Sequence, residues 1–151
     1  MSDMSESLHL SFTVDGSDFT GAGRASAAMK RILREIGVDM DTIRRCSICM
    51  YEGEINMVIH ANGGTADVDI DAGGVKIVLC DDGPGIADVE QAMQEGFSTA
   101  EEGVRDLGFG AGMGLPNMKR YSDEMTIDTE VGKGTTVTMT VYFPKGGGDD
   151  S

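Results

Sequence analysis

The stretch from Glu52 to Leu115 constrains the fold of this chain most, because it places three motifs in a fixed order between regular elements. The first is an acid and an amide, Glu52 and Asn56, whose spacing of four puts both side chains on one face of an apolar helix. The second is an apolar strand, 75–80, that runs into the sequence DDGPG, and the third is a run of glycines beginning at Gly108. Each motif alone is weak. In this order they indicate a nucleotide-binding site.

Length and charge limit the classes of protein that fit this chain. Its 151 residues suit one compact domain with a sizeable core. The formal net charge of -14 argues against sequence-independent binding of nucleic acid, which depends on Lys and Arg neutralising phosphates. A basic partner protein suits this charge better. An anionic nucleotide would need Mg²⁺, backbone N–H groups and a few local cations to bind here.

The cysteines and the hydropathy pattern predict a cytoplasmic protein. Three cysteines are an odd number, and the sequence contains neither a secretory signal nor an apolar run long enough for a membrane helix. We therefore expect reduced thiols and no membrane span. Cys46 and Cys49 form a C-x-x-C with no second pair to complete a zinc site, which favours structural thiols over metal or redox use.

Periodicity and turn signals predict the regular elements of a domain spanning 8–143. Asp39 or Asp41 can cap the second helix, and Gly37 ends the first. We expect an edge strand at 8–15, helices at 22–36 and 39–61, a hairpin of strands 65–71 and 74–80, a short helix near 87–94, a mobile lid at about 95–112, a helix at 113–121, and final strands at 124–130 and 134–143. Residues 1–7 and the tail 144–151 are expected to be disordered.

Helical geometry separates the acidic residues of the second helix. Its predicted apolar stripe consists of Ile48, Tyr51, Ile55, Val58 and Ile59. Glu52 flanks this stripe on the side of Asn56, whereas Glu54 points away from both and is the poorer catalytic candidate. In phosphoryl transfer a carboxylate can orient or deprotonate the acceptor, and one amide carbonyl is sufficient as a protein ligand for Mg²⁺. The alternative is an ordinary helix with polar residues facing solvent.

The two glycine motifs could surround a nucleotide. Asp81 follows a buried strand, where its carboxylate can accept a hydrogen bond from an exocyclic amine, and Gly83 and Gly85 leave room for a flat ring. Unhindered N–H groups in the glycine run could bind phosphates. The alternatives are a simple turn and a flexible surface loop. A Rossmann or P-loop site is excluded, because neither G-x-G-x-x-G after a strand nor Walker A spacing is present.

With these motifs assembled, the chain resembles the GHKL ATPase superfamily over about 8–143, and is most similar to the bacterial anti-sigma-factor serine/threonine kinases. The resemblance implies an α/β (α+β) two-layer sandwich, with a mixed, mostly antiparallel sheet and helices on one face. It implies that Glu52 is catalytic, that Asn56 binds Mg²⁺ and that Asp81 contacts the adenine amino group. The further ATP-binding positions that it implies are Gly83, Gly85, Ser98, Thr99, Arg105, Gly108, Gly110, Gly112, Met113, Gly114, Leu115 and Thr135.

The function that the resemblance implies is transfer of the ATP γ-phosphate to a serine or threonine of a small antagonist protein of the anti-anti-sigma kind. A second surface would sequester a sigma factor, and relatives pair as homodimers. Direct contact with nucleic acid and membrane attachment are not expected. The alternative is a nucleotide-dependent switch that holds a partner without phosphorylating it, although such a protein would not need Glu52.

Overall fold

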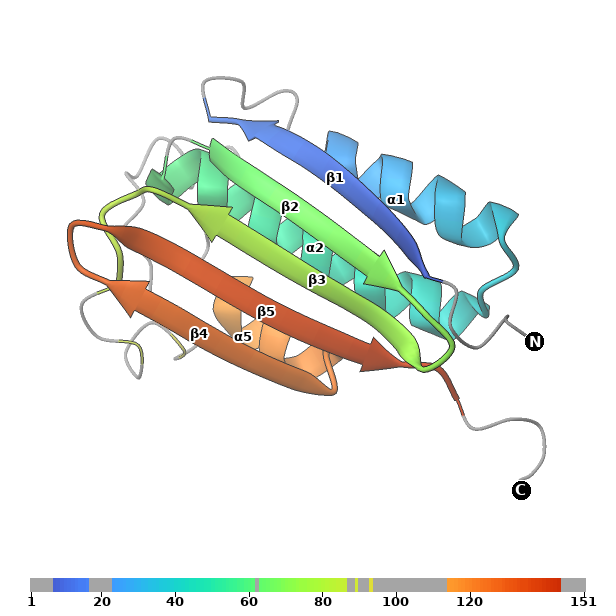
Figure 1. Ribbon diagram of the computed structural model, residues 1–151. Coiled ribbons are helices and arrows are strands. Elements are labelled where there is room, and N and C mark those ends of the chain that lie inside the picture. Colours follow the sequence, from blue (N-terminus) through green and yellow to red (C-terminus); the bar gives the residue numbers. More distant parts are fainter. Residues whose placement is uncertain are drawn as a thin grey trace.

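The computed structural model describes residues 7–16, 23–61, 63–86, 89, 93 and 114–144. Their strands form one sheet, and their helices all lie behind that sheet in the view of Figure 1. The strands are β1 (Leu8–Asp15), β2 (Gly63–Ile70), β3 (Gly74–Asp81), β4 (Glu124–Glu130) and β5 (Gly134–Tyr142), and the helices are α1 (Arg24–Glu35), α2 (Met40–Ala61) and α5 (Gly114–Tyr121). This confirms the predicted two-layer fold with helices on one face.

The sheet has the strand order β1-β2-β3-β5-β4. Every pair of neighbouring described strands is antiparallel, so the sheet is more uniform than the mixed sheet expected from the sequence. β1 lies at one edge, as its alternating sequence predicted, and β4 lies at the other. β3 and β5 are therefore interior strands, and each is hydrogen-bonded to a neighbouring strand on both sides.

The core fills the space between the sheet and the helices. Along β3, Val75, Ile77 and Leu79 are buried, while the intervening Lys76 and Cys80 are exposed on the helix-free face. This period of two follows from the alternation of side chains along a strand. Asp81 continues the buried series by two residues, so its side chain is directed to the helix side of the sheet.

Local signals set the helix boundaries. Gly37, with a φ of 88°, ends the turn after α1, and such a left-handed conformation favours glycine. Asp39 is the residue that caps α2, because its carboxylate accepts a hydrogen bond from the Thr42 backbone N–H at 3.0 Å. The short turn between the helices is therefore encoded where the sequence predicted it.

The predicted apolar stripe of α2 is wrong in part, because Tyr51 is 41% exposed. α2 packs against the sheet, against α1 and against α5, so burial extends over a wider arc than one stripe. Tyr51 lies at the edge of this arc, and its ring edge approaches Gly23 at the start of α1. The fully buried apolar side chains of the first half of α2 are instead Ile43, Cys46, Cys49 and Met50.

Several expectations concern residues outside the described part of the chain. These are the lid at about 95–112, residues 1–6 and residues 145–151. Of the short helix near 87–94, the structure describes Val89 and Met93, which are joined by a helical hydrogen bond of 3.0 Å. Among the described helices, none is both long and apolar enough to cross a membrane.

Candidate nucleotide site

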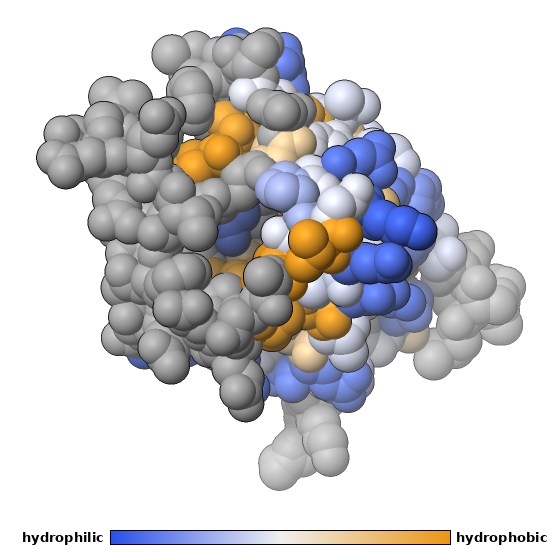
Figure 2. Space-filling model, turned by 90° about the vertical axis from the view of Figure 1, so that its left-hand side faces the viewer, coloured by the Kyte–Doolittle hydropathy of each residue, from blue (hydrophilic) through white to orange (hydrophobic). Residues whose placement is uncertain are grey.

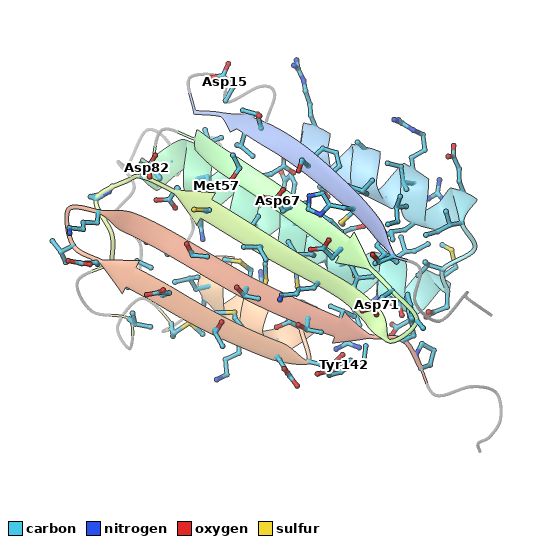
Figure 3. The ribbon with its side chains drawn as sticks, viewed as in Figure 1. Asp15, Met57, Asp67, Asp71, Asp82 and Tyr142 are labelled. Atoms are coloured by element: carbon cyan, nitrogen blue, oxygen red, sulfur yellow. The ribbon has the colours of Figure 1, made fainter. Side chains whose placement is uncertain are left out.

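The predicted site residues that the structure describes gather at the end of the sheet where β3 terminates. In Figure 3, Asp15, Met57 and Asp82 lie at this end, whereas Asp71 and Tyr142 lie at the opposite end. Figure 2 looks onto this end of the molecule, and hydrophilic residues gather toward its right-hand side, where the helix-free face of the sheet lies.

Asp81 is the last residue of β3 and is held in a tight turn. Its Oδ1 accepts a hydrogen bond from the Gly83 backbone N–H at 2.8 Å, and Asp81 as a whole is partly buried. Thr135 is directly opposite Asp81 on β5, and its buried hydroxyl lies 2.8 Å from that of Thr129 on β4. The structure thus brings together the two residues for which the sequence predicted adenine contact and proximity to the nucleotide.

The glycines after Asp81 are required by packing, which is a reason that the sequence did not indicate. A Cβ on Gly83 would lie 2.6 Å from the Ala61 Cβ at the end of α2. Gly85 has a φ of 80°, and a Cβ there would lie 2.4 Å from the carbonyl oxygen of Glu130. The side chains that these glycines lack would point at the protein itself, so the glycines let this segment pass between α2 and β4.

Thr129 anchors the same segment, and sequence reasoning missed it. The Ile86 backbone N–H donates to Thr129 Oγ1 at 2.9 Å, and the Gly132 N–H donates to the Pro84 carbonyl at 2.8 Å. The β4–β5 turn therefore fixes the DDGPG segment from its far side. The sequence did contain a signal for Thr129. It and Thr135 lie at equal distances from the predicted turn, which makes them cross-strand partners.

Glu52 and Asn56 face α5, which follows the predicted glycine lid. Asn117 Nδ2 donates to Glu52 Oε2 at 3.0 Å, and Glu52 is partly buried. Gly114 lies against Asn56 so closely that a Cβ would be 2.8 Å from both amide heteroatoms of that side chain. Asn117 was not identified from the sequence, although its spacing of three from Gly114 puts both residues on one helix face.

Glu54, between these two residues, has a different task. Its carboxylate accepts hydrogen bonds from the backbone N–H groups of Gly23, Ala25 and Ser26 at 2.8–3.1 Å. A carboxylate at this place satisfies otherwise unpaired donors and complements the positive end of α1. Glu54 is 2% exposed and therefore holds α1 against α2.

Gly64 on β2 links the α2 part of the site to the β3 part. A Cβ there would lie 2.8 Å from the Met57 sulfur and 3.1 Å from the Asp81 Cβ. Met57 follows Asn56 directly, so the predicted metal ligand and the predicted adenine contact belong to one region. Leu115, another predicted position, is buried. The remaining predicted positions lie outside the described residues: Ser98, Thr99, Arg105, Gly108, Gly110, Gly112 and Met113.

The donor set near Asn56 fits Mg²⁺ held mainly by phosphate oxygens. No group of three or more His, Cys, Asp or Glu side chains in the described part of the chain could hold a metal alone. Mg²⁺ takes few protein ligands and keeps its waters and phosphate oxygens, so the Asn56 carbonyl is a suitable ligand. Cys46 and Cys49 do not compete for it, because burial raises the pKa of each thiol to about 12.

Comparison with known proteins identifies a family that matches most of the chain. The family model of the histidine kinase-like ATPase domain matches residues 18–141. An anti-sigma F factor from Geobacillus sp. strain WCH70 is 30% identical, covering 94% of this chain and 96% of the relative. The serine/threonine-protein kinase RsbT of Bacillus subtilis is 31% identical, covering 72% of this chain and 78% of the relative.

A solved structure shares the fold. It contains the RsbU and RsbW domains of a Mycobacterium tuberculosis protein, and it superposes on 90% of this chain with a TM-score of 0.63 at 21% identity. The present chain spans only 32% of the length of that protein.

Proposed function

Because this chain belongs to the family of histidine kinase-like ATPase domains, we propose that it is an ATP-dependent serine/threonine protein kinase of the anti-sigma regulatory type. The observation that carries the proposal is the geometry of Glu52. It shares a face of α2 with Asn56, and one of its carboxylate oxygens has no hydrogen-bond partner among the described residues. A protein that only bound nucleotide would not need this carboxylate.

The proposed reaction uses the side chains on α2 and β3 in separate roles. Asp81 receives the adenine amino group, and Asn56 supplies a ligand to Mg²⁺, which neutralises phosphate charge when bound. Glu52 orients the serine or threonine hydroxyl of the acceptor protein and takes its proton. The acceptor oxygen forms the new bond to the γ-phosphorus, the bond from that phosphorus to the β,γ-bridging oxygen breaks, and ADP leaves with the electron pair.

The partners follow from the anti-sigma relatives and from charge. The phosphate acceptor is a small antagonist protein, and a sigma factor is the second partner, held by a separate surface. A net charge of -14 favours a basic surface on such a partner. We also propose that the protein works in the cytoplasm as a homodimer.

The proposal is tested by transfer of ³²P from [γ-³²P]ATP to a protein that co-purifies with this chain from its source cells. We expect label on serine or threonine, and loss of transfer in Glu52→Gln. The variant should still bind Mg-ADP, since Glu52 contacts the acceptor rather than the nucleotide. Undiminished transfer in Glu52→Gln would remove Glu52 from the mechanism.

Binding of nucleotide is measured separately, by thermal unfolding with and without Mg-ADP. A ligand at one hundred times its dissociation constant adds about 2.7 kcal/mol to the free energy of unfolding. Asp81→Asn keeps an oxygen that can accept the hydrogen bond from the Gly83 N–H, but it removes the negative charge of the group that would accept from adenine. The increase in melting temperature with Mg-ADP should therefore be much smaller in this variant. A Mg-ADP shift without any phosphate transfer would instead support the nucleotide-dependent switch.

A further inference from the structure

α2 and α5 pack antiparallel, and their contacts follow one another in order along both helices. Gly114 lies at Asn56 and Asn117 at Glu52. One turn further, the Cys49 thiol donates to the Met118 carbonyl at 3.7 Å. The contacts thus extend from the start of α5 back along α2, away from the candidate site.

The far end of α5 is fixed by an arginine. Arg45 Nε donates to the Tyr121 carbonyl at 3.1 Å, and its Nη2 lies 3.0 Å from Asp123 Oδ1. The second oxygen of the same carboxylate accepts the Tyr142 backbone N–H at 2.7 Å, which ties this corner to β5. α5 is therefore held to α2 and to the sheet independently of the Asn117 contact.

We propose that Asn117 is a positioning residue for Glu52. Its amide fixes one carboxylate oxygen and leaves the other directed to the acceptor hydroxyl. The inference rests on the proposed kinase function. It concerns a residue on α5 that the sequence motifs of the site did not include.

The chemistry of the pair fixes its orientation. An ionised carboxylate only accepts hydrogen bonds, so the nitrogen of the Asn117 amide, not its oxygen, must face Glu52. Among the described residues, Asn117 is the only hydrogen-bond partner of this carboxylate. Without it, the carboxylate of Glu52 could rotate about its terminal bonds, and small misplacement of a reacting group lowers the rate steeply.

The other described groups near Glu52 do not hold its carboxylate in place. Glu54 is occupied by three backbone N–H groups of α1 and lies on another side of α2. Gly114 has no side chain, and the next exposed residue of α5, Lys119, has no described contact with Glu52. Asn117 lies within α5, and its side-chain amide reaches Glu52 at 3.0 Å.

The test compares three substitutions in the full chain. Asn117→Leu has a similar shape without a donor, Asn117→Asp replaces the donor by a second carboxylate, and Asn117→Gln keeps the donor on a longer side chain. Lys119→Leu, on the exposed side of the same helix, is the matched control. Each variant is assayed for kcat and KM with Mg-ATP and the co-purifying acceptor protein, and for the thermal shift with Mg-ADP.

We expect kcat to fall about tenfold or more in the Leu and Asp variants and less in the Gln variant, with KM for Mg-ATP within about twofold of wild type. The Mg-ADP shift should persist in all of them, and the control should match wild type. Unchanged kcat in Asn117→Leu would overturn the role of Asn117 but not the proposed kinase function. Parallel loss of kcat and of the Mg-ADP shift would overturn it in favour of a structural role. A wild-type chain that transfers no phosphate would overturn the proposed function, and this inference with it.

Discussion

Two glutamates that are two positions apart on α2 show how differently one residue type is used. Glu54 is buried and accepts three backbone hydrogen bonds from the start of α1. Glu52 is partly buried and accepts one hydrogen bond from the side chain of Asn117. Both oxygens of the first carboxylate are engaged in holding α1, whereas one oxygen of the second has no hydrogen-bond partner among the described residues, as its proposed role requires.

Replacement of these residues should therefore have opposite consequences. Glu54→Ala leaves three N–H groups at the α1 terminus without their acceptor, so the free energy of unfolding should fall by about 3 kcal/mol. Glu52→Ala should change it by less than about 1 kcal/mol, because only one partly exposed hydrogen bond is lost. Urea unfolding of both variants measures the difference. Equal destabilisation would contradict the division of roles.

At the scale of elements, the edge strand β1 is joined to β2 by a cross-strand cluster on the helix-free face. His9 Nδ1 lies 2.6 Å from Asp69 Oδ1, and its Nε2 lies 3.2 Å from Asp67 Oδ1. The hydrogen bond with Asp69 is the main cause that raises the pKa of His9, and the charge of Asp67 adds to it. The Ser11 hydroxyl also donates a hydrogen bond to Asp67, and Lys76 on β3 is opposite Asp69.

This cluster predicts how the stability of the β1–β2 pairing depends on pH. Because the folded pKa of His9 is raised, its contribution is fully present below the unfolded value near 6.5 and is lost as pH rises through the folded value. The free energy of unfolding of the His9→Asn variant should therefore be furthest below that of wild type at about pH 5.5, and the two free energies should converge at higher pH. Urea unfolding across this range measures the gap, and a gap that widened with pH would contradict the assignment.

At the scale of the whole molecule, charge imbalance opposes folding. The chain carries 26 acidic residues against 12 Lys and Arg, and acidic side chains recur on the helix-free face of the sheet, at Asp67, Asp69, Asp128 and Glu130. Self-repulsion of this kind destabilises a compact state and is screened by salt. Local ion pairs such as Arg44–Asp41 are exposed and contribute little.

We therefore expect the melting temperature of the nucleotide-free protein to rise as KCl increases from about 0.05 to about 0.5 M. The reason is that screening weakens the repulsion among acidic side chains more than it weakens the few exposed ion pairs. Differential scanning calorimetry at fixed pH measures the effect, with sucrose in place of salt as the uncharged control. A melting temperature that fell with KCl would show that attractive ion pairs dominate.

The sequence by itself determined the elements and their order. β1, the turn at Gly37, the β2–β3 hairpin and the final hairpin lie within a few residues of their predicted positions, because periodicity, caps and glycine turns act over a few neighbouring residues. The family resemblance made Asp81 and Thr135 nucleotide-contacting positions, and the pairing of β3 with β5 in the structure places them opposite each other. The roles of Glu52, Asn56 and Asp81 in binding and catalysis stay predictions.

Only the tertiary structure decided which side chains meet across distant segments. It placed Asn117 on Glu52, gave Glu54 to the start of α1, and left Tyr51 at the margin of a helix that is covered on several sides. It also showed that Gly83 and Gly85 pack closely against α2 and β4. These outcomes depend on how helices and strands pack in space, and a pattern confined to one element carries no information about the surface that another element presents to it.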